Sequence, residues 1–172
     1  SSILKMLTGR AYGYLDENKF QEISGYTNPY ESPHDFFSIG HTSTSVSLAT
    51  GLAKGRDLAG REKENIIAVI GDGALSGGEA LEGLDTAGEM NTNLIIIVND
   101  NEQSIAEVHG GMYKSLSELR ATYGKTDNNL FRCMGLDYCY LEEGHDIAKL
   151  IEFLNDLKNI DHPIVAHIHT QK

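Results

Sequence analysis

The sequence predicts an α/β fold in which a parallel sheet carries helices on both faces. Apolar runs of strand length recur along the chain, and segments with helical spacing of apolar residues separate them. Glycines or Asn/Asp clusters end two of the apolar runs. Alternation of strands and helices is typical of parallel sheets with right-handed crossovers. The length of 172 residues and the 40% of hydrophobic residues suit one domain over 1–172.

The first elements are expected in the following order. Residues 1–39 contain turn-forming glycine and proline, so we expect irregular structure there. Residues 42–57 are mostly small and apolar, which favours a buried helix that packs closely through Gly51 and Gly55. Residues 65–70 form a β-branched, apolar run, as expected for a strand that is covered on both faces.

The central part of the chain predicts a second strand–helix–strand passage. Residues 78–87 are expected to be helical, because apolar side chains recur there at spacings of three and four: Ala80, Leu81, Leu84 and Ala87. Residues 94–99 then form a second apolar run and predict another buried strand.

The last part of the chain begins with a polar stretch at 109–129, for which no element is predicted. A short strand is expected at 136–140, and an amphipathic helix at 146–157 that begins with Asp146 as its capping residue. Residues 164–168 predict the final strand.

Two strand ends carry the candidate functional residues. The run that ends at Gly71-Asp72-Gly73 is followed, 29 positions after Asp72, by Asn101 at the end of the next strand. Because ligands bind outside the carboxyl ends of parallel strands, these side chains are expected to meet. Oxygen ligands suit Mg²⁺, which usually keeps phosphate oxygens in its coordination shell. We therefore predict a magnesium site of Asp72, Asn101 and the main-chain carbonyl of Gln103.

Small residues follow the predicted carboxylate ligand. Gly73 and Ala74 open the next segment, where free backbone amides at a helix N-terminus would face a diphosphate. The sequence therefore predicts a Mg²⁺–diphosphate site at this edge of the sheet.

Composition narrows the classes of partner. The formal net charge of −11, with scattered Lys and Arg, argues against nucleic acid. No apolar run approaches the roughly 20 residues of a membrane span. The two cysteines, Cys133 and Cys139, do not suggest a disulfide framework, so we expect a cytoplasmic location. Both ends look cut, which suggests a fragment of a longer chain.

The Gly-Asp-Gly and the Asn that follows about thirty residues later resemble the diphosphate-binding motif of thiamine diphosphate enzymes. Further blocks are similar to the 1-deoxy-D-xylulose-5-phosphate synthase family, and the resemblance covers essentially the whole chain. These blocks lie at residues 6–10, 38–45, 71–78, 99–105 and 143–146.

The resemblance implies the diphosphate domain of the thiamine diphosphate-binding fold, with thiamine diphosphate and Mg²⁺ as cofactors. The complete enzyme would be a transferase that decarboxylates pyruvate and joins the remaining two-carbon unit to glyceraldehyde 3-phosphate. The product, 1-deoxy-D-xylulose 5-phosphate, is a precursor of isoprenoids, thiamine and pyridoxal. In this family, Asp72 and Asn101 would bind the metal, and Gly73 and Ala74 would contact the diphosphate.

The resemblance also implies that Gly40, His41 and Thr42 lie against the cofactor. His41 would act on the diphosphate or on a reacting group, and is the candidate catalytic residue. Family members usually have Ser at the position of Thr42, so the hydroxyl is kept.

The resemblance further implies that part of the active site lies elsewhere. The pyrimidine-binding domain, which in this family supplies the glutamate that activates the cofactor, is absent, and the intact enzyme would be a homodimer. The chain alone is therefore expected to bind Mg²⁺ and diphosphate weakly but not to turn over. Two alternatives remain open: a subunit of a split thiamine-dependent transketolase-like enzyme, and a non-catalytic relative that binds a metal or nucleotide.

Several histidines have two possible interpretations. His109 follows the Asn segment and either belongs to a flap over the cofactor or is simply solvated. His167 and His169 alternate on the last strand and mark either a strand end or a metal pair. His34 either belongs to a loop turn or orients a substrate.

Overall fold

The computed structural model describes residues 2–103 and 109–171. The chain divides into two compact units, Ser1–His41 and Thr42–Lys172, and each is described by itself. Among the described residues, no helix has both the length and the apolar character needed to cross a membrane.

The first unit consists of short helical segments and turns, whereas irregular structure was predicted there. Its segments are α1 (Ser2–Lys5), η1 (Met6–Arg10), α2 (Tyr12–Leu15) and η2 (Glu17–Glu22). Charged side chains hold the unit together. The buried Arg10 donates two hydrogen bonds to Asp35, of which Nη2 to Oδ1 measures 3.0 Å, and Lys5 donates to Glu31 at 3.0 Å. The ion pair with Arg10 therefore gives Asp35 a structural role in the first unit.

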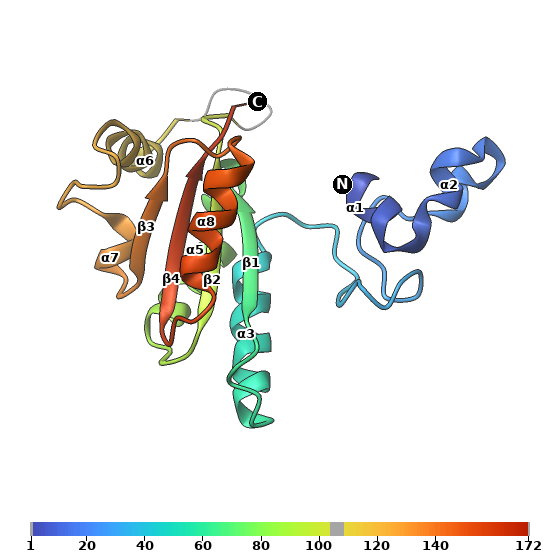
Figure 1. Ribbon diagram of the computed structural model, residues 1–172, viewed down its shortest axis with the longest axis horizontal. Coiled ribbons are helices and arrows are strands. Elements are labelled where there is room, and N and C mark those ends of the chain that lie inside the picture. The colour runs from blue at the N-terminus through green and yellow to red at the C-terminus, as the bar shows by residue number, and fades with distance from the viewer. Residues whose placement is uncertain (1, 104–108, 172) are drawn as a thin grey trace. The chain divides into compact units, whose positions relative to one another are not determined.

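The second unit is built on a sheet that has four parallel strands within the described residues (Figure 1). The strands lie in the order β1-β2-β4-β3. Their bounds are Ile66–Gly71 for β1, Leu94–Asp100 for β2, Asp137–Leu141 for β3 and Pro163–His169 for β4. The predicted strands and their parallel arrangement are confirmed.

Helices cover both faces of this sheet, as predicted. They are α3 (Ser45–Leu58), α4 (Asp72–Leu75), α5 (Gly78–Gly88), α6 (Gly111–Ala121), α7 (Leu130–Cys133) and α8 (Ile147–Leu157). Side chains from α3, α5, α6 and α7 share one core with the sheet, and α8 packs on the opposite face (Figure 1). Asp146 caps α8 as expected, because its Oδ1 accepts hydrogen bonds from the amides of Ala148 (3.0 Å) and Lys149 (3.2 Å).

One face of β1 is exposed, so the prediction that this strand is covered on both faces was wrong. Ile67 and Val69 keep 53% and 59% of their surface exposed. They are in register with Ile95 and Ile97, which belong to the core that packs against α8. The helix thus covers the middle of the sheet on this side but leaves these two β1 side chains open.

The close contact between α3 and α5 comes from a different glycine than predicted. Gly51 and Gly55 are exposed, and a Cβ added at either would meet nothing within 4 Å, so the expected packing through them was wrong. A Cβ on Gly83 of α5 would instead lie 2.8 Å from the backbone nitrogen of Ser47 in α3. The side of α3 that faces the core carries Val46, Ala49 and other side chains.

The polar stretch at 109–129 contains a helix that the sequence interpretation missed. Leu116 and Leu119 of α6 are buried in the core, and Met112 packs against it. Their spacing of four and three residues is helical, but the many polar residues of the outer face hid the pattern. The short α7 was also missed, and it places Phe131 in the same core.

Candidate magnesium and diphosphate site

Asp72 and Asn101 lie at the carboxyl ends of two adjacent strands. β1 and β2 pair directly, with Gly71 in register with Asn99. Asp72 is the first residue of α4, immediately after β1, and its carboxylate accepts a hydrogen bond from the backbone amide of Asn101. The two residues therefore meet at one edge of the sheet, as their positions in the sequence predict.

The Asp72 carboxylate is buried and only partly satisfied. The residue is 3% exposed, and its Oδ2 has no hydrogen-bond partner. Burial raises the pKa of the Asp72 carboxyl above its usual value, and the charge of Asp100 raises it further. Hydrogen bonds from the amides of Gly73 and Asn101 lower this pKa, but by less. A buried acceptor without a partner costs free energy, which a cation at this position would offset.

A tight turn presents the other two predicted ligands. The Asn101 Oδ1 accepts a hydrogen bond from the amide of Gln103 at 3.1 Å. Glu102, between them, has φ of 64°, a left-handed conformation that is uncommon for a residue with a side chain. Its amide donates to Asp100 Oδ1 at 3.0 Å. The shape of the turn thus depends on the Asp100 side chain.

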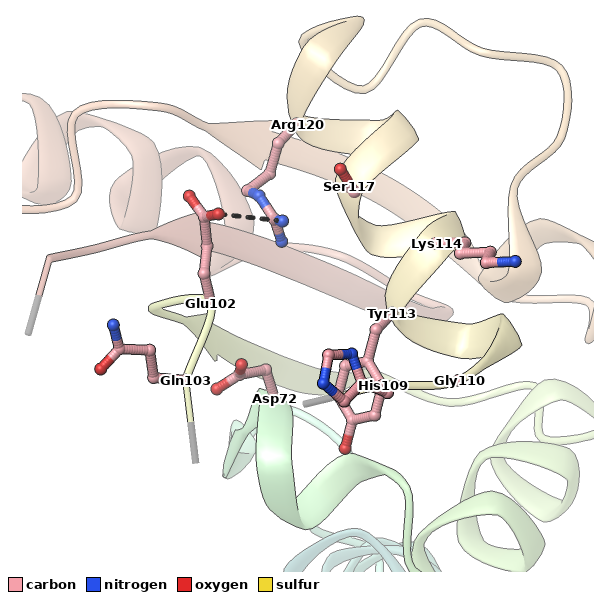
Figure 2. Close-up of a pocket in the computed structure, with 9 residues that line it drawn as sticks. All are labelled: Asp72, Glu102, Gln103, His109, Gly110, Tyr113, Lys114, Ser117 and Arg120. Carbon is pink, nitrogen blue, oxygen red and sulfur yellow. Dashed lines mark ion pairs between the residues drawn. The ribbon is translucent and has the colours of Figure 1, made fainter. Parts of the chain in front are cut away.

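A cavity of about 460 Å³ lies beside the Asp72 carboxylate. Its lining includes Asp72, Gln103, His109, Lys114 and Arg120. Figure 2 shows the Asp72 carboxylate directed toward the segment that carries Gln103, whereas the Lys114 side chain points away from Asp72. His109 therefore shares a cavity with the predicted metal ligand, and its membership of a flap stays a prediction. Residues 104–108, which include the end of the 99–105 block, lie outside the described residues.

The three predicted ligands suit Mg²⁺ better than they suit a metal whose ligands all come from the protein. Within residues 2–103 and 109–171, no three or more His, Cys, Asp or Glu side chains form a metal-binding group. A carboxylate, an amide oxygen and a main-chain carbonyl would leave positions for phosphate and water oxygens, as Mg²⁺ prefers. Magnesium ligation by Asp72, Asn101 and Gln103 stays a prediction.

The residues predicted to contact the cofactor fall in both units. Gly73 and Ala74 follow Asp72 in α4. Gly40 and His41 belong to the first unit, where Gly40 packs against the ring of Tyr26. Thr42 opens the second unit. The grouping of these three with Asp72 therefore rests on the sequence resemblance.

A buried polar network next to the site was missed in the sequence interpretation. Asp100 and His167 are fully buried, and His167 Nε2 lies 2.9 Å from Asp100 Oδ2. Tyr138 Oη lies 2.7 Å from the other ring nitrogen of His167, and Arg120 donates to Asp100 Oδ2. The signal for this network is a histidine that follows Ile164-Val165-Ala166 in an apolar strand, because a buried imidazole needs polar partners.

The structure assigns separate partners to the two histidines of β4. His169 lies 3.2 Å from a carboxylate oxygen of Glu142 and 3.2 Å from one of Glu102. His167 makes the buried contacts with Asp100 and Tyr138 instead. Among the described residues, the two histidines therefore do not form a shared metal-binding group.

Comparison with known protein families identifies the family of this chain. The family model described as 1-deoxy-D-xylulose-5-phosphate synthase matches residues 1–127 and 120–170. These segments cover almost the whole chain. The chain belongs to the 1-deoxy-D-xylulose-5-phosphate synthase family.

Several bacterial synthases of this family align with the chain from end to end. The enzyme of Clostridium beijerinckii is 38% identical over all of this chain and 33% of its own length. The enzyme of Caldanaerobacter subterraneus subsp. tengcongensis is 39% identical over 98% of this chain and 33% of its own length. The chain thus spans about a third of the length of the synthases that it matches.

The chain is also shorter than the matching part of those synthases. The alignment with the Clostridium beijerinckii synthase extends over 207 residues, although this chain has 172. The two segments that match the synthase family overlap at residues 120–127, at the end of α6.

Protonation of Asp100 in the buried polar network is expected to lower the stability of the protein at low pH. Burial opposes ionisation of Asp100, but hydrogen bonds from His167 and the Glu102 amide, with the charge of Arg120, lower its pKa from 3.8 to about 2. A carboxyl whose pKa falls on folding stabilises the protein above its unfolded-state pKa and loses this contribution as protons bind. We expect about 2 kcal/mol to be lost between about pH 5 and pH 2, measured by urea unfolding.

Asp100→Asn should flatten this part of the pH profile, because it removes the titrating carboxyl. The exposed Asp85→Asn on α5 is the matched control and should keep the slope of the unmodified protein. Equal slopes for Asp100→Asn and the unmodified protein would show that Asp100 does not carry the effect.

Proposed function

We propose that this chain binds the diphosphate of thiamine diphosphate through Mg²⁺ as part of a 1-deoxy-D-xylulose-5-phosphate synthase. The observation that carries the proposal is the buried Asp72 carboxylate, with one oxygen unpartnered, in contact with Asn101 at adjacent strand ends. Membership of a family that uses thiamine diphosphate and Mg²⁺ supports it.

Each residue has a proposed part in holding the cofactor. Asp72 supplies the anionic metal ligand, and Asn101 and the Gln103 carbonyl supply neutral ones. Gly73 and Ala74 let the chain approach the diphosphate closely, because neither carries a bulky side chain. Gly40, His41 and Thr42 would lie against the cofactor, and His41 would act on the diphosphate or on a reacting group.

The proposed reaction of the complete enzyme joins pyruvate and glyceraldehyde 3-phosphate. The bond between the carboxyl and keto carbons of pyruvate breaks and releases CO₂, and a new carbon–carbon bond forms to the aldehyde carbon of glyceraldehyde 3-phosphate. The bound cofactor supplies the electron sink for this exchange. The part of the protein described here would orient the cofactor and balance the charge of its diphosphate.

We propose that the remaining groups of the active site come from polypeptide outside these 172 residues. The 172 residues span about a third of the matching synthases, and the resemblance places the activating glutamate in a different domain. That domain, supplied by the same polypeptide or by a second chain, would complete the site, in a homodimer as the resemblance implies.

A turnover assay tests this division of labour. The 172-residue chain, supplied with both substrates, thiamine diphosphate and Mg²⁺, is expected to form no 1-deoxy-D-xylulose 5-phosphate, because the glutamate that would activate the cofactor is expected outside these residues. The measurement is product formation followed by mass spectrometry, with a complete synthase from Clostridium beijerinckii as the positive control. Product from the chain alone would contradict the proposal that further polypeptide is needed.

Calorimetry separates the proposed cofactor from a nucleotide. We expect Mg²⁺-dependent binding of thiamine diphosphate and weaker binding of ADP under the same conditions. Equal or tighter binding of ADP would favour a non-catalytic metal- or nucleotide-binding relative. This alternative shares the fold but makes no use of the thiamine.

A further inference from the structure

We propose that His167 is a positioning residue for the predicted metal ligands, acting through Asp100 on the turn that contains Asn101 and Gln103. The inference rests on the magnesium site proposed above. It concerns side chains that would not touch the metal but determine the backbone conformation of the ligands that do.

The first step of the argument is the burial of Asp100. Its side chain is fully buried at the end of β2, so its charge has to be balanced inside the protein. Arg120 and His167 both contact Oδ2, which leaves Oδ1 to accept the Glu102 amide at 3.0 Å. The carboxylate thus joins α6 and β4 to the turn.

The second step is the conformation of the turn. Glu102 has φ of 64°, which costs free energy for a residue with a Cβ and persists only when its surroundings hold it. The hydrogen bond from its amide to Asp100 provides one restraint, and contacts of its side chain with Arg120 (3.4 Å) and His169 (3.2 Å) provide others. In this conformation the Asn101 amide contacts the Asp72 carboxylate.

The third step is the orientation of His167. Tyr138 Oη lies 2.7 Å from Nδ1, so the hydroxyl can donate to Nδ1 while Nε2 carries the proton that it donates to Asp100. The Tyr138 ring in turn stacks on Phe131, at 5.7 Å between centroids and 12° between planes. The orientation of the imidazole is therefore determined by β3 and α7 as well as by its own strand.

Such outer contacts commonly determine metal affinity. Ligands held by hydrogen bonds bind more tightly, and loss of the outer partner typically weakens a site by about 10- to 100-fold. In this protein the outer partner of the turn is Asp100, and His167 is one of the two side chains that hold it.

Two variants of His167 test the proposal with readouts other than turnover. His167→Leu removes the donor to Asp100, and His167→Gln places an amide NH₂ near the position of Nε2. We expect His167→Leu to weaken Mn²⁺ binding in the presence of thiamine diphosphate by about tenfold or more, measured by electron paramagnetic resonance. His167→Gln should remain within about threefold of the unmodified protein.

Amide hydrogen exchange at Glu102 supplies a measurement that needs no metal. In His167→Leu the Glu102 amide should exchange about tenfold faster, because Asp100, then held by Arg120 alone, restrains it less. Leu84→Ala on α5 is the control for general loss of stability, since it disturbs the same core without touching the contacts that hold His167, and it should alter neither Mn²⁺ affinity nor Glu102 exchange selectively.

The outcomes separate this inference from the proposed function. Unchanged Glu102 exchange in His167→Leu overturns the inference, as does a His167→Gln variant that behaves like His167→Leu. If the unmodified protein binds no Mn²⁺ with thiamine diphosphate, the proposed magnesium site is wrong and the inference that depends on it fails with it. Faster exchange together with weaker Mn²⁺ binding, restored by glutamine, supports it.

Discussion

Asp72→Asn is expected to weaken Mg²⁺-dependent binding of thiamine diphosphate by about 100-fold, equivalent to about 2.7 kcal/mol. The substitution keeps the size of the side chain but removes the only negative charge among the three predicted ligands. The remaining amide and carbonyl oxygens are neutral and attract the cation less strongly. Isothermal titration with thiamine diphosphate at a fixed Mg²⁺ concentration measures the change.

The same substitution should make the protein without ligands more stable. Folding raises the pKa of Asp72, so keeping this carboxyl ionised at neutral pH costs stability in the folded state. Its Oδ2 also lacks a hydrogen bond, and it lies near the charge of Asp100. Removing the charge is expected to raise the free energy of unfolding by about 1 kcal/mol.

Asp85→Asn is the matched control for both measurements. It removes the same charge from an exposed position of α5, and we expect neither cofactor affinity nor stability to change. If Asp72→Asn retains full affinity for the Mg²⁺ complex, Asp72 is not the metal ligand. If Asp72 is the metal ligand, Asp72→Asn should lose affinity for the Mg²⁺ complex and gain stability in the absence of ligands.

Gly88→Ala is expected to destabilise the second unit by about 3 kcal/mol, because the added methyl group overpacks a backbone contact. A Cβ at Gly88 would lie 1.8 Å from the Met134 carbonyl oxygen, at the end of α5. The obstacle is main chain, held between α7 and β3, so it cannot rotate away as a flexible side chain would. Thermal unfolding should show a fall in Tm of about 6–12 °C.

Gly55→Ala is the control for this substitution and should act in the opposite direction. Gly55 lies within α3 and is exposed, and a Cβ there would meet no atom within 4 Å. Alanine is a better helix former than glycine, so we expect a gain of about 0.5–1 kcal/mol. A Gly88→Ala protein as stable as the unmodified one would mean that α5 and the Met134 turn pack less closely than described.

Much of the candidate site was accessible from the sequence because its residues lie next to strand ends. Apolar runs ended at Asp72 and shortly before Asn101, and parallel strands bring such ends to one edge of the sheet. The contact between these two residues follows from that rule. The burial of Asp72 does not, because burial depends on α4 and on the chain that packs around it.

Other features were missed for identifiable reasons. The outer face of α6 is polar enough to hide Leu116 and Leu119, and the sequence therefore suggested a loop. The strand β1 looked suited to burial on both sides, but α8 reaches only part of the sheet and leaves Ile67 and Val69 exposed. An apolar sequence shows that a strand can be buried, and the surrounding elements decide whether it is.

The sequence alone determined the α/β class, the strands and the family. The class and the strands follow from local periodicity, and the family follows from short sequence motifs. Only the tertiary structure revealed the network of Asp100, His167 and Tyr138. Asp100 and His167 lie 67 residues apart in the sequence and meet because β4 pairs directly with β2 and separates it from β3. Strand order and register depend on packing across the whole unit, so no local pattern specifies which buried side chains become partners.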